Sequence, residues 1–317
     1  MNEKDALNMR LYNQHIYRQT CKNVAELSTY LAAIQGQDYE GAKWSLALRL
    51  PGTTEKEIED AISARQVVRT WPMRGTLHLV SAADVNWMLN LCTPRILAGS
   101  AGRHAGLELD EIIFSRSRDL IEKALAGGQR LTRKALMALL ESNGITTGGQ
   151  RGYHILWWLA QKGVICMGPQ EGKQQTFVLL TEWVRNARNL SREEALVELA
   201  KRYFISRGPA TLADFVWWSG LKISEARAAL QGAAGELQKD KLNEQDCWFA
   251  PQIARLSMPA LRADLLPGFD EYMLAYTDRS LALNPLFAQR VCPGNSGMFS
   301  STLLCKGKVR GSGHRVT

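Results

Sequence analysis

The sequence predicts an α+β protein that is mainly helical. It is expected to contain tandem winged-helix modules, each a helix-turn-helix with a β-hairpin wing, followed by a strand-rich C-terminal part. Two observations predict this: apolar residues recur at helical spacing along most of the chain, and paired β-branched runs with polar turns follow two of the helix groups. The length of 317 residues, with 45% hydrophobic and 22% charged residues, fits a globular chain with room for several small modules.

The first predicted module spans residues 1–112 and begins with helices. One helix face collects four apolar residues at helical spacing, namely Val24, Leu27, Leu31 and Ile34. A second helix is expected over residues 39–48, and a third follows with Thr54 as its cap. The segment 67–81 then predicts two short strands joined by a turn around Pro72 to Gly75. Three helices followed by a hairpin is the order of a winged helix.

The second module, residues 113–188, repeats this order. Thr132 is expected to cap a short helix, and RGYHILWWLAQKG predicts the next one. GVICMGP and QQTFVLL predict a second wing, with a polar turn from Gln170 to Lys173. An irregular helical protein with incidental hairpins is the alternative to this repeated pattern.

The third module, residues 189–245, restarts with a capping box formed by Ser191 and Glu194. Two further helices separated by a tight turn at Gly220 again have helix-turn-helix spacing. Residues 246–317 differ in character. Their β-branched and alternating stretches, PGFDEYMLAY and SSTLLCKGKV, predict strands, and the last residues, GSGHRVT, are expected to be unstructured.

The charge balance indicates a polyanionic partner. The chain has 39 Lys+Arg against 31 Asp+Glu, a net charge of +8, which suits nucleic acid but also an anionic membrane surface or simple solubility. No run of eighteen apolar residues and no signal peptide is visible, so we expect no membrane partner and a cytoplasmic location. The six cysteines lack zinc-site spacing, so they are expected to be reduced, and neither a metal nor a cofactor is indicated.

One polar motif interrupts the apolar pattern of the first module. Gln35-Gly36-Gln37-Asp38 follows one predicted helix and precedes another. Such a tetrapeptide is ordinarily a turn, and a Gln-x-Gln spacing is expected by chance in a chain with 16 glutamines. The chain has no Walker motif, nucleophile elbow or His-Glu-x-x-His motif, so nucleophilic and metal chemistry are poorly supported.

The segments around this motif resemble the AlkZ family of DNA glycosylases, which includes YcaQ-like and winged-helix DNA-binding domain-containing proteins. The resemblance covers most of the chain, from about Leu27 to Phe299, and its clearest stretches are IQGQD, AKWSLALRL, RTWPMRGTLHLV, GQRGYHILWW, KQQTFVLL, SREEALVELAKRYF, GPATLADFVWWSGL and LLPGFDEYML. It implies tandem winged-helix modules around a DNA-sized concavity. It also implies that the chain acts as a monomer on double-stranded DNA that contains alkylated bases.

The resemblance places Gln35 and Gln37 on the catalytic motif of that family. An amide cannot take a proton at neutral pH, but its carbonyl dipole can face positive charge developing on a sugar, and it can orient a water. Because an N7-alkylated purine is already a cationic leaving group, we expect hydrolysis of bulky or cationic alkylated purines without a Schiff base. The unhooking of interstrand crosslinks is implied by the resemblance alone. Asp38 either polarises the water or caps the following helix.

Six residues are candidates for contacting DNA: Arg69, Trp71, Arg74, Arg151, Tyr153 and His154. The arginines could bind phosphates and the wing could reach the minor groove, whereas core packing of Trp71 and solvation of the arginines is an equally good reading. In the pairs Trp157-Trp158 and Trp217-Trp218, core packing is favoured over base stacking because helical neighbours point about 100° apart.

Two features of the resemblance have no assigned role. Asp270-Glu271-Tyr272 matches an Asp-Glu-Tyr stretch of the family, but sequence alone assigns it no chemistry. By resemblance the family continues beyond the last strand seen here, so we expect a C-terminal sheet that is either truncated or altered by a frame-shift. A non-enzymatic winged-helix transcriptional regulator is the rival function. It would require sequence preference and symmetric half-sites, whereas a repair enzyme would tolerate many sequences.

Overall fold

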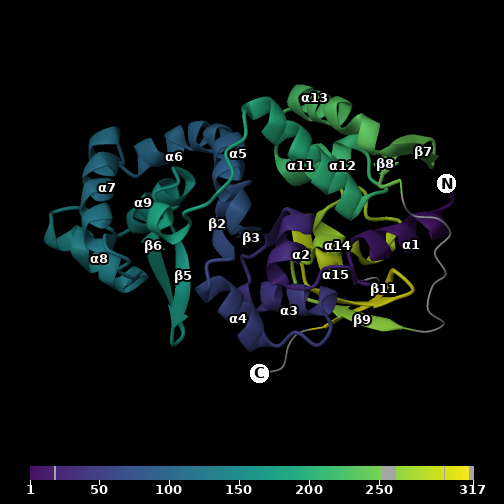
Figure 1. Cartoon of the computed structure of the whole chain (residues 1–317), viewed down its shortest axis with the longest axis horizontal. Helices are drawn as coiled ribbons and strands as arrows, with labels where there is room; N and C mark the ends of the chain where they lie inside the picture. Colours follow the sequence, from purple (N-terminus) through teal and green to yellow (C-terminus); the bar gives the residue numbers. More distant parts are fainter. Residues whose placement is uncertain (18, 252–261, 296, 314–317) are drawn as a thin grey trace. The chain divides into compact units, whose positions relative to one another are not determined.

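The computed structural model describes residues 1–17, 19–251, 262–295 and 297–313. The chain divides into two compact units: unit 1 joins Met1–Ile58 to Arg192–Thr317, and unit 2 is Glu59–Ser191. Both units combine helices with antiparallel strands, which confirms the mixed, mainly helical fold class (Figure 1). The boundaries of these two units differ from those of the four segments predicted from the sequence, and the division into four modules stays a prediction.

The first part of unit 1 contains α1 (Glu3–Asn13), α2 (Val24–Leu31), β1 (Ala33–Gln35) and α3 (Tyr39–Arg49). The predicted helix over 39–48 is confirmed. The placement of Ile34 on the face of α2 is wrong, because the helix ends at Leu31 and Ile34 lies in β1. Ala32, between the two elements, has a φ of 61°, which no helical residue adopts.

The second part of unit 1 holds three long helices and several strands. Its elements are α11 (Arg192–Arg207), α12 (Leu212–Ser219), α13 (Ile223–Ala233), β7 (Gln238–Leu242), β8 (Gln245–Phe249), β9 (Ala263–Leu266), α14 (Glu271–Leu274), α15 (Ala288–Val291), β10 (Ser301–Cys305) and β11 (Lys308–Gly313). Helix α12 begins with a capping box between Thr211 and Asp214. It ends at Gly220, whose φ of 71° is the left-handed conformation that glycine tolerates.

The strands in the second part of unit 1 form two antiparallel sheets, β7-β8 and β11-β10-β9. SSTLLCKGKV therefore forms strands, as predicted. The strand predicted for PGFDEYMLAY is wrong over residues 271–274, which form α14, because the Asp270 side chain accepts a hydrogen bond from the Tyr272 N–H and caps a helical turn. Residues 311–313, predicted to be unstructured, belong to β11. Residues 314–317 of the predicted tail lie outside the described residues.

Unit 1 packs its C-terminal elements on the N-terminal helix. A buried cluster joins side chains of α1 to β9, α14 and β10, and its members include Leu7, Leu11, Ile16, Leu266, Tyr272, Leu274 and Leu304. A second group consists of aromatic rings in contact at centroid distances of 5.1–5.4 Å, from Tyr203, Phe204, Phe215 and Trp218. Helix α14 contacts both groups, since Tyr272 and Leu274 belong to the first and Tyr203 of the second donates to the Ala275 carbonyl that follows α14.

Unit 2 begins within helix α4 (Glu55–Ser63). Thr54 caps this helix as predicted: its hydroxyl accepts from the Glu57 N–H, and the Glu57 carboxylate accepts from the Thr54 N–H. The unit then contains β2 (Val67–Met73), β3 (Thr76–Ser81), α5 (Val85–Gly99), α6 (Ala101–Gly106), α7 (Glu111–Leu125), β4 (Leu131–Thr132), α8 (Arg133–Ser142), α9 (Arg151–Gln161), β5 (Ile165–Glu171), β6 (Gln174–Leu179) and α10 (Leu180–Trp183). Its strands lie in the order β3-β2-β5-β6-β4. Both predicted hairpins are present, and Thr132 caps α8 as predicted, accepting from the Ala135 N–H at 3.2 Å.

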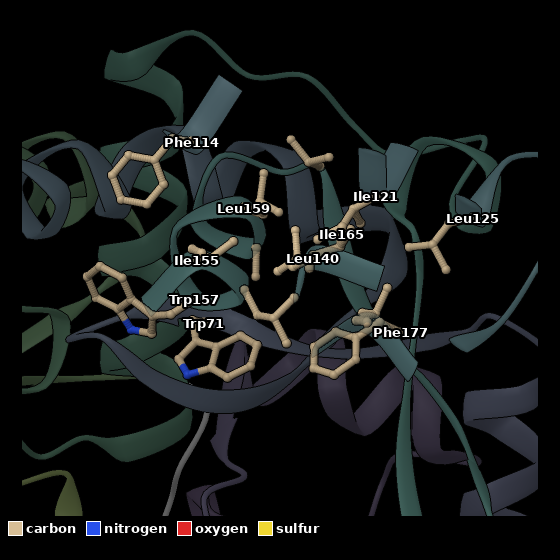
Figure 2. Close-up of a cluster of buried hydrophobic side chains, with 14 of the residues drawn as sticks. Trp71, Phe114, Ile121, Leu125, Leu140, Ile155, Trp157, Leu159, Ile165 and Phe177 are labelled. Atoms are coloured by element: carbon tan, nitrogen blue, oxygen red, sulfur yellow. The ribbon is translucent and has the colours of Figure 1, made fainter. Parts of the chain in front are cut away.

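The core of unit 2 lies between α7, α8 and α9 and the strands (Figure 2). Its largest members are Trp71, Phe114, Trp157 and Phe177. Trp157 also donates from Nε1 to the Gly75 carbonyl at 3.1 Å, so helix α9 is tied to the turn of the first hairpin. Within the described ranges, no helix is long and apolar enough to cross a membrane. All six cysteines are free thiols.

Candidate active site

The Gln-x-Gln motif forms a turn inside unit 1. Residues 35–38 connect the last position of the buried strand β1 to the first residue of α3. The strand is short and fully buried, so the chain leaves the core at Gln35 and reaches the surface at Gln37. Both glutamines therefore lie on one turn, one at its base and one at its exposed part.

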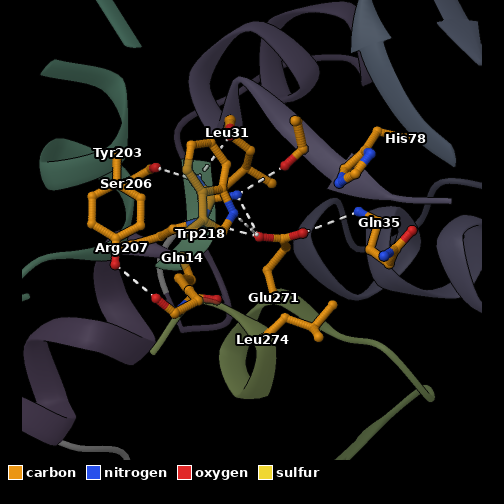
Figure 3. A network of polar contacts seen from close by, with 12 residues as sticks. Gln14, Leu31, Gln35, His78, Tyr203, Ser206, Arg207, Trp218, Glu271 and Leu274 are labelled. Atoms are coloured by element: carbon orange, nitrogen blue, oxygen red, sulfur yellow. Dashed lines mark hydrogen bonds and ion pairs between the residues drawn. The ribbon is translucent and has the colours of Figure 1, made fainter. Parts of the chain in front are cut away.

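Gln35 is part of the framework of this turn. Its side chain is 8% exposed, and its Oε1 accepts hydrogen bonds from the N–H groups of Gly36 at 2.9 Å and Gln37 at 3.1 Å. Its own N–H donates to Oε1 of Glu271 at 3.0 Å (Figure 3). The amide oxygen of Gln35 thus fixes the backbone that presents Gln37.

Gln37 and Asp38 are both exposed. Asp38 holds the N-cap position of α3, yet its side chain makes no capping hydrogen bond. Its carboxylate lies over Gly41 instead, since a Cβ at Gly41 would approach Oδ2 of Asp38 to 2.5 Å. An exposed amide and an exposed carboxylate therefore stand side by side in the sequence, at the start of one helix.

A buried ion pair supports the base of the turn. Glu271 and Arg207 have fully buried side chains, joined at 2.7 Å between Oε2 and Nη2. Trp218 donates from Nε1 to the same Oε2 at 2.9 Å. Oε1 of Glu271 accepts from Gln35, so one carboxylate connects α11 and α12 to β1 (Figure 3).

A second buried ion pair lies beside the first. Asp270 and Arg49 are joined by two hydrogen bonds of 2.8 Å, and both side chains are fully buried. Ser45 also donates to Asp270, at 2.7 Å. Burial alone would raise the pKa of Asp270, but the Arg49 guanidinium and the hydrogen bonds lower it by more than burial raises it. The pKa of Asp270 therefore lies below its ordinary value. This pair fastens α3 to α14.

Three of the predicted DNA contacts lie on the first hairpin of unit 2, and the structure buries two of them. Arg69 is 6% exposed and donates to Oε1 of Gln175 at 2.8 Å, and Trp71 is 4% exposed in the core. Arg74 lies at the hairpin turn, half-buried, with Nη2 at 3.2 Å from Nε2 of His78. Of these three residues, only Arg74 reaches the surface to an appreciable extent.

The other three predicted contacts lie in the first turn of α9. Arg151 donates to the carbonyls of Thr146 at 3.0 Å and Glu108 at 3.1 Å, so its guanidinium closes a loop. Tyr153 is 37% exposed. His154 is half-buried against the rings of His104 and Trp157, and burial followed by the nearby Arg103 charge lowers its pKa. All six predicted contacts belong to unit 2, whereas the glutamine turn belongs to unit 1.

A family model described as DNA glycosylase AlkZ-like matches residues 29–315. The chain belongs to the AlkZ-like DNA glycosylase family. Its members hydrolyse N-glycosyl bonds in DNA, so the chain is an enzyme, and the rival interpretation as a non-enzymatic regulator loses its support. The family predicted from IQGQD and the longer segments is confirmed.

A relative of this AlkZ-like chain and a solved structure similar to it both come from Streptomyces sahachiroi. An interstrand DNA cross-link repair glycosylase is 26% identical over 327 residues, a match that covers 95% of this chain and 85% of the relative. The solved structure of the DNA glycosylase AlkZ superposes with a TM-score of 0.82 at 22% identity, covering 98% of this chain and 87% of that one. The second similarity shows that the fold is shared.

The sequence interpretation of this AlkZ-like chain missed Arg207 and left Glu271 without a role. The available signal was a pair of acidic residues, Asp270 and Glu271, within the otherwise apolar stretch PGFDEYMLAY. Carboxylates in such a stretch are buried only when cations pair with them. Arg207, however, closes a 16-residue helix and is separated from Glu271 by 64 positions, so no local pattern joins them. No cluster of His, Cys, Asp and Glu among the described residues could hold a metal ion.

Proposed function

We propose that this enzyme is a monofunctional glycosylase that removes alkylated purines, cationic at N7 or bulky, from double-stranded DNA. The observation that carries the proposal is the turn at residues 35–38, where a buried Gln35 fixes the backbone and an exposed Gln37 is presented. The cross-link repair activity in the name of the Streptomyces relative supports bulky lesions and crosslinks as substrates.

The chemistry follows from what an amide can do. In the proposed mechanism Gln37 orients a water and turns its carbonyl dipole toward the positive charge that develops on the deoxyribose. The N7-alkylated base leaves as a neutral purine, so no general acid is needed. Asp38 is the proposed auxiliary carboxylate that polarises the attacking water.

Lys43 of helix α3, the helix that follows the glutamine turn, is unsuited to a Schiff-base mechanism. Lys43 is largely buried and forms ion pairs with Glu40 at 2.8 Å and with Glu55 at 2.5 Å. A nucleophilic lysine must be neutral, whereas two carboxylates favour the charged ammonium. This arrangement supports hydrolysis by water over lyase chemistry.

The mode of DNA binding is also proposed. Helices α7, α8 and α9 precede the β5–β6 hairpin, and this order supports a winged-helix module in unit 2. Arg74 and Tyr153 remain at the surface and are the proposed contacts among the predicted residues. We further propose a monomer acting in the cytoplasm, on a duplex held through its phosphates.

Excision of a defined lesion tests the site. The protein is incubated with duplex DNA bearing N7-methylguanine or a nitrogen-mustard crosslink, and alkali with heat then cleaves at abasic sites. Gln37→Ala is expected to abolish excision while DNA binding is retained, because the amide acts on the reacting sugar and not on the duplex. Full activity in Gln37→Ala would contradict the assignment. No cleavage by the wild type above a Gln35→Ala/Gln37→Ala double variant would contradict the proposed substrate class.

A further inference from the structure

The strand that leads to the glutamine turn begins with a strained residue. Ala32 has φ 61° and ψ −56°, a conformation that costs an alanine roughly 1–3 kcal/mol and persists only when the surroundings impose it. Arg207 imposes it: Nη1 donates to the Leu31 carbonyl and Nη2 to the Ala33 carbonyl, both at 2.8 Å. One guanidinium therefore holds the chain on both sides of Ala32.

Glu271 continues this support to the end of the strand. Its Oε2 is occupied by Arg207, at 2.7 and 3.1 Å, and by Trp218. Its Oε1 accepts from the Gln35 N–H at 3.0 Å. Because the Gln35 side chain binds the N–H groups of Gly36 and Gln37, hydrogen bonds run without interruption from Arg207 to the backbone of Gln37 (Figure 3).

Stability alone does not require these charges. Breaking a buried ion pair is destabilising, but replacing both partners by apolar residues of similar volume is often neutral or stabilising. What an apolar pair cannot provide is an acceptor for Gln35 and donors for the carbonyls of Leu31 and Ala33. The geometry of the pair is therefore directed at the backbone that carries the turn.

The neighbouring pair of Asp270 and Arg49 provides a matched comparison. It is equally buried, and its two hydrogen bonds of 2.8 Å are as short. Its further bonds lead to Ser45, Gln14 and the Tyr272 N–H. None of these partners lies in residues 31–37.

We propose that Glu271 and Arg207 are positioning residues of the glycosylase, which set the backbone of residues 31–37 so that Gln37 meets the sugar. The proposal rests on the proposed function, since it takes the glutamine turn as the active site. Neither residue touches substrate. Both act through Gln35.

Single-turnover kinetics at saturating DNA test the proposal in the full chain. Glu271→Gln is expected to lower the excision rate about 10- to 100-fold with an unchanged Kd, because a displacement of about 1 Å at a reacting group costs about that much. Asp270→Asn, the matched control, is expected to lose a comparable amount of thermal stability while its folded fraction keeps the wild-type rate. Equal rates for Glu271→Gln and wild type would overturn the proposal, and so would equal rate losses in the two variants.

Two further measurements cover misfolding and inactivity. The double variant Arg207→Met/Glu271→Leu leaves no buried charge unpaired, so it is expected to lose less stability than Glu271→Gln yet to excise as slowly; a wild-type rate in its folded fraction would overturn the proposal. Hydrogen exchange in a peptide covering residues 31–38 should speed up in Glu271→Gln and not in Asp270→Asn, and unchanged exchange would refute the positioning role. Hydrogen exchange can be measured without enzymatic activity, and Gln37→Ala tests the catalytic role of the turn separately. Failure of the positioning proposal can therefore be distinguished from failure of the proposed function.

Discussion

Asp38 occupies the position of a helix cap without acting as one. An aspartate at the N-cap usually accepts a backbone N–H of the first turn, but no such bond is formed here. The carboxylate lies over Gly41, where any Cβ would displace it. Sequence alone left two roles open for Asp38, a cap or a carboxylate that polarises water. The absence of the capping bond favours the second role, beside the exposed Gln37.

Asp38→Asn separates the two roles. If the carboxylate polarises the attacking water, the excision rate falls about 100-fold or more, as for loss of a general base, and the free energy of unfolding changes by less than about 0.5 kcal/mol. Urea unfolding and single-turnover excision measure the two quantities. An unchanged rate in Asp38→Asn would contradict the water-polarising role, and a stability loss of about 1 kcal/mol in Asp38→Ala would identify Asp38 as a cap after all.

The elements that sequence predicted well are those with local signals of their own, which are helical spacing in the helices and paired β-branched runs with polar turns in the hairpins. Helices α3 and α8 and both hairpins of unit 2 belong to this group. Two of the errors lie at β1 and α14, which carry or support the glutamine turn. Helix α2 ends because Arg207 binds the carbonyls around Ala32, and α14 is one short turn capped by Asp270. Interactions between residues more than 170 positions apart, such as those of Arg207 with Leu31 and Ala33, leave no trace in local periodicity.

The ion pair of Arg49 and Asp270, which links α3 to α14, makes the stability of the fold depend on pH. The folded pKa of Asp270 lies below its ordinary value of 3.8, so the folded chain binds fewer protons there than the unfolded chain. The contribution of the Asp270 charge to the free energy of unfolding is therefore complete above pH 3.8, and it is lost as the pH falls through the lower pKa of the folded chain. We expect wild type to exceed Asp270→Asn in unfolding free energy by about 3–5 kcal/mol at neutral pH, with the difference shrinking below pH 3.8. Urea unfolding of both proteins across this range measures it, and a difference independent of pH would contradict the charge pairing.

The positive charge of the whole molecule is unevenly divided between its units. Unit 2 has 16 Lys+Arg against 11 Asp+Glu, whereas unit 1 has 23 against 20. Composition predicted a polyanionic partner but not where the cations would gather. In unit 2, Arg130, Arg133 and Lys134 are exposed around the start of α8, and none forms an ion pair within the described part of the chain. The Arg133 charge also acts on Tyr153, whose pKa burial raises and Arg133 lowers.

This group defines a prediction for DNA binding. Arg130→Gln/Arg133→Gln/Lys134→Gln is expected to weaken duplex affinity and to reduce the slope of log Kd against log salt by up to about 0.9 for each phosphate that the variant no longer binds. The single-turnover rate at saturating DNA should not change, because the proposed catalytic turn, residues 35–38, lies in unit 1. The control is Arg116→Gln/Arg118→Gln/Lys123→Gln on α7, which removes the same charge from exposed positions. Because the net charge of the two variants is identical, a larger decrease in affinity for the first variant locates phosphate binding at α8. Equal slopes in both would mean that only the overall charge of the enzyme attracts DNA.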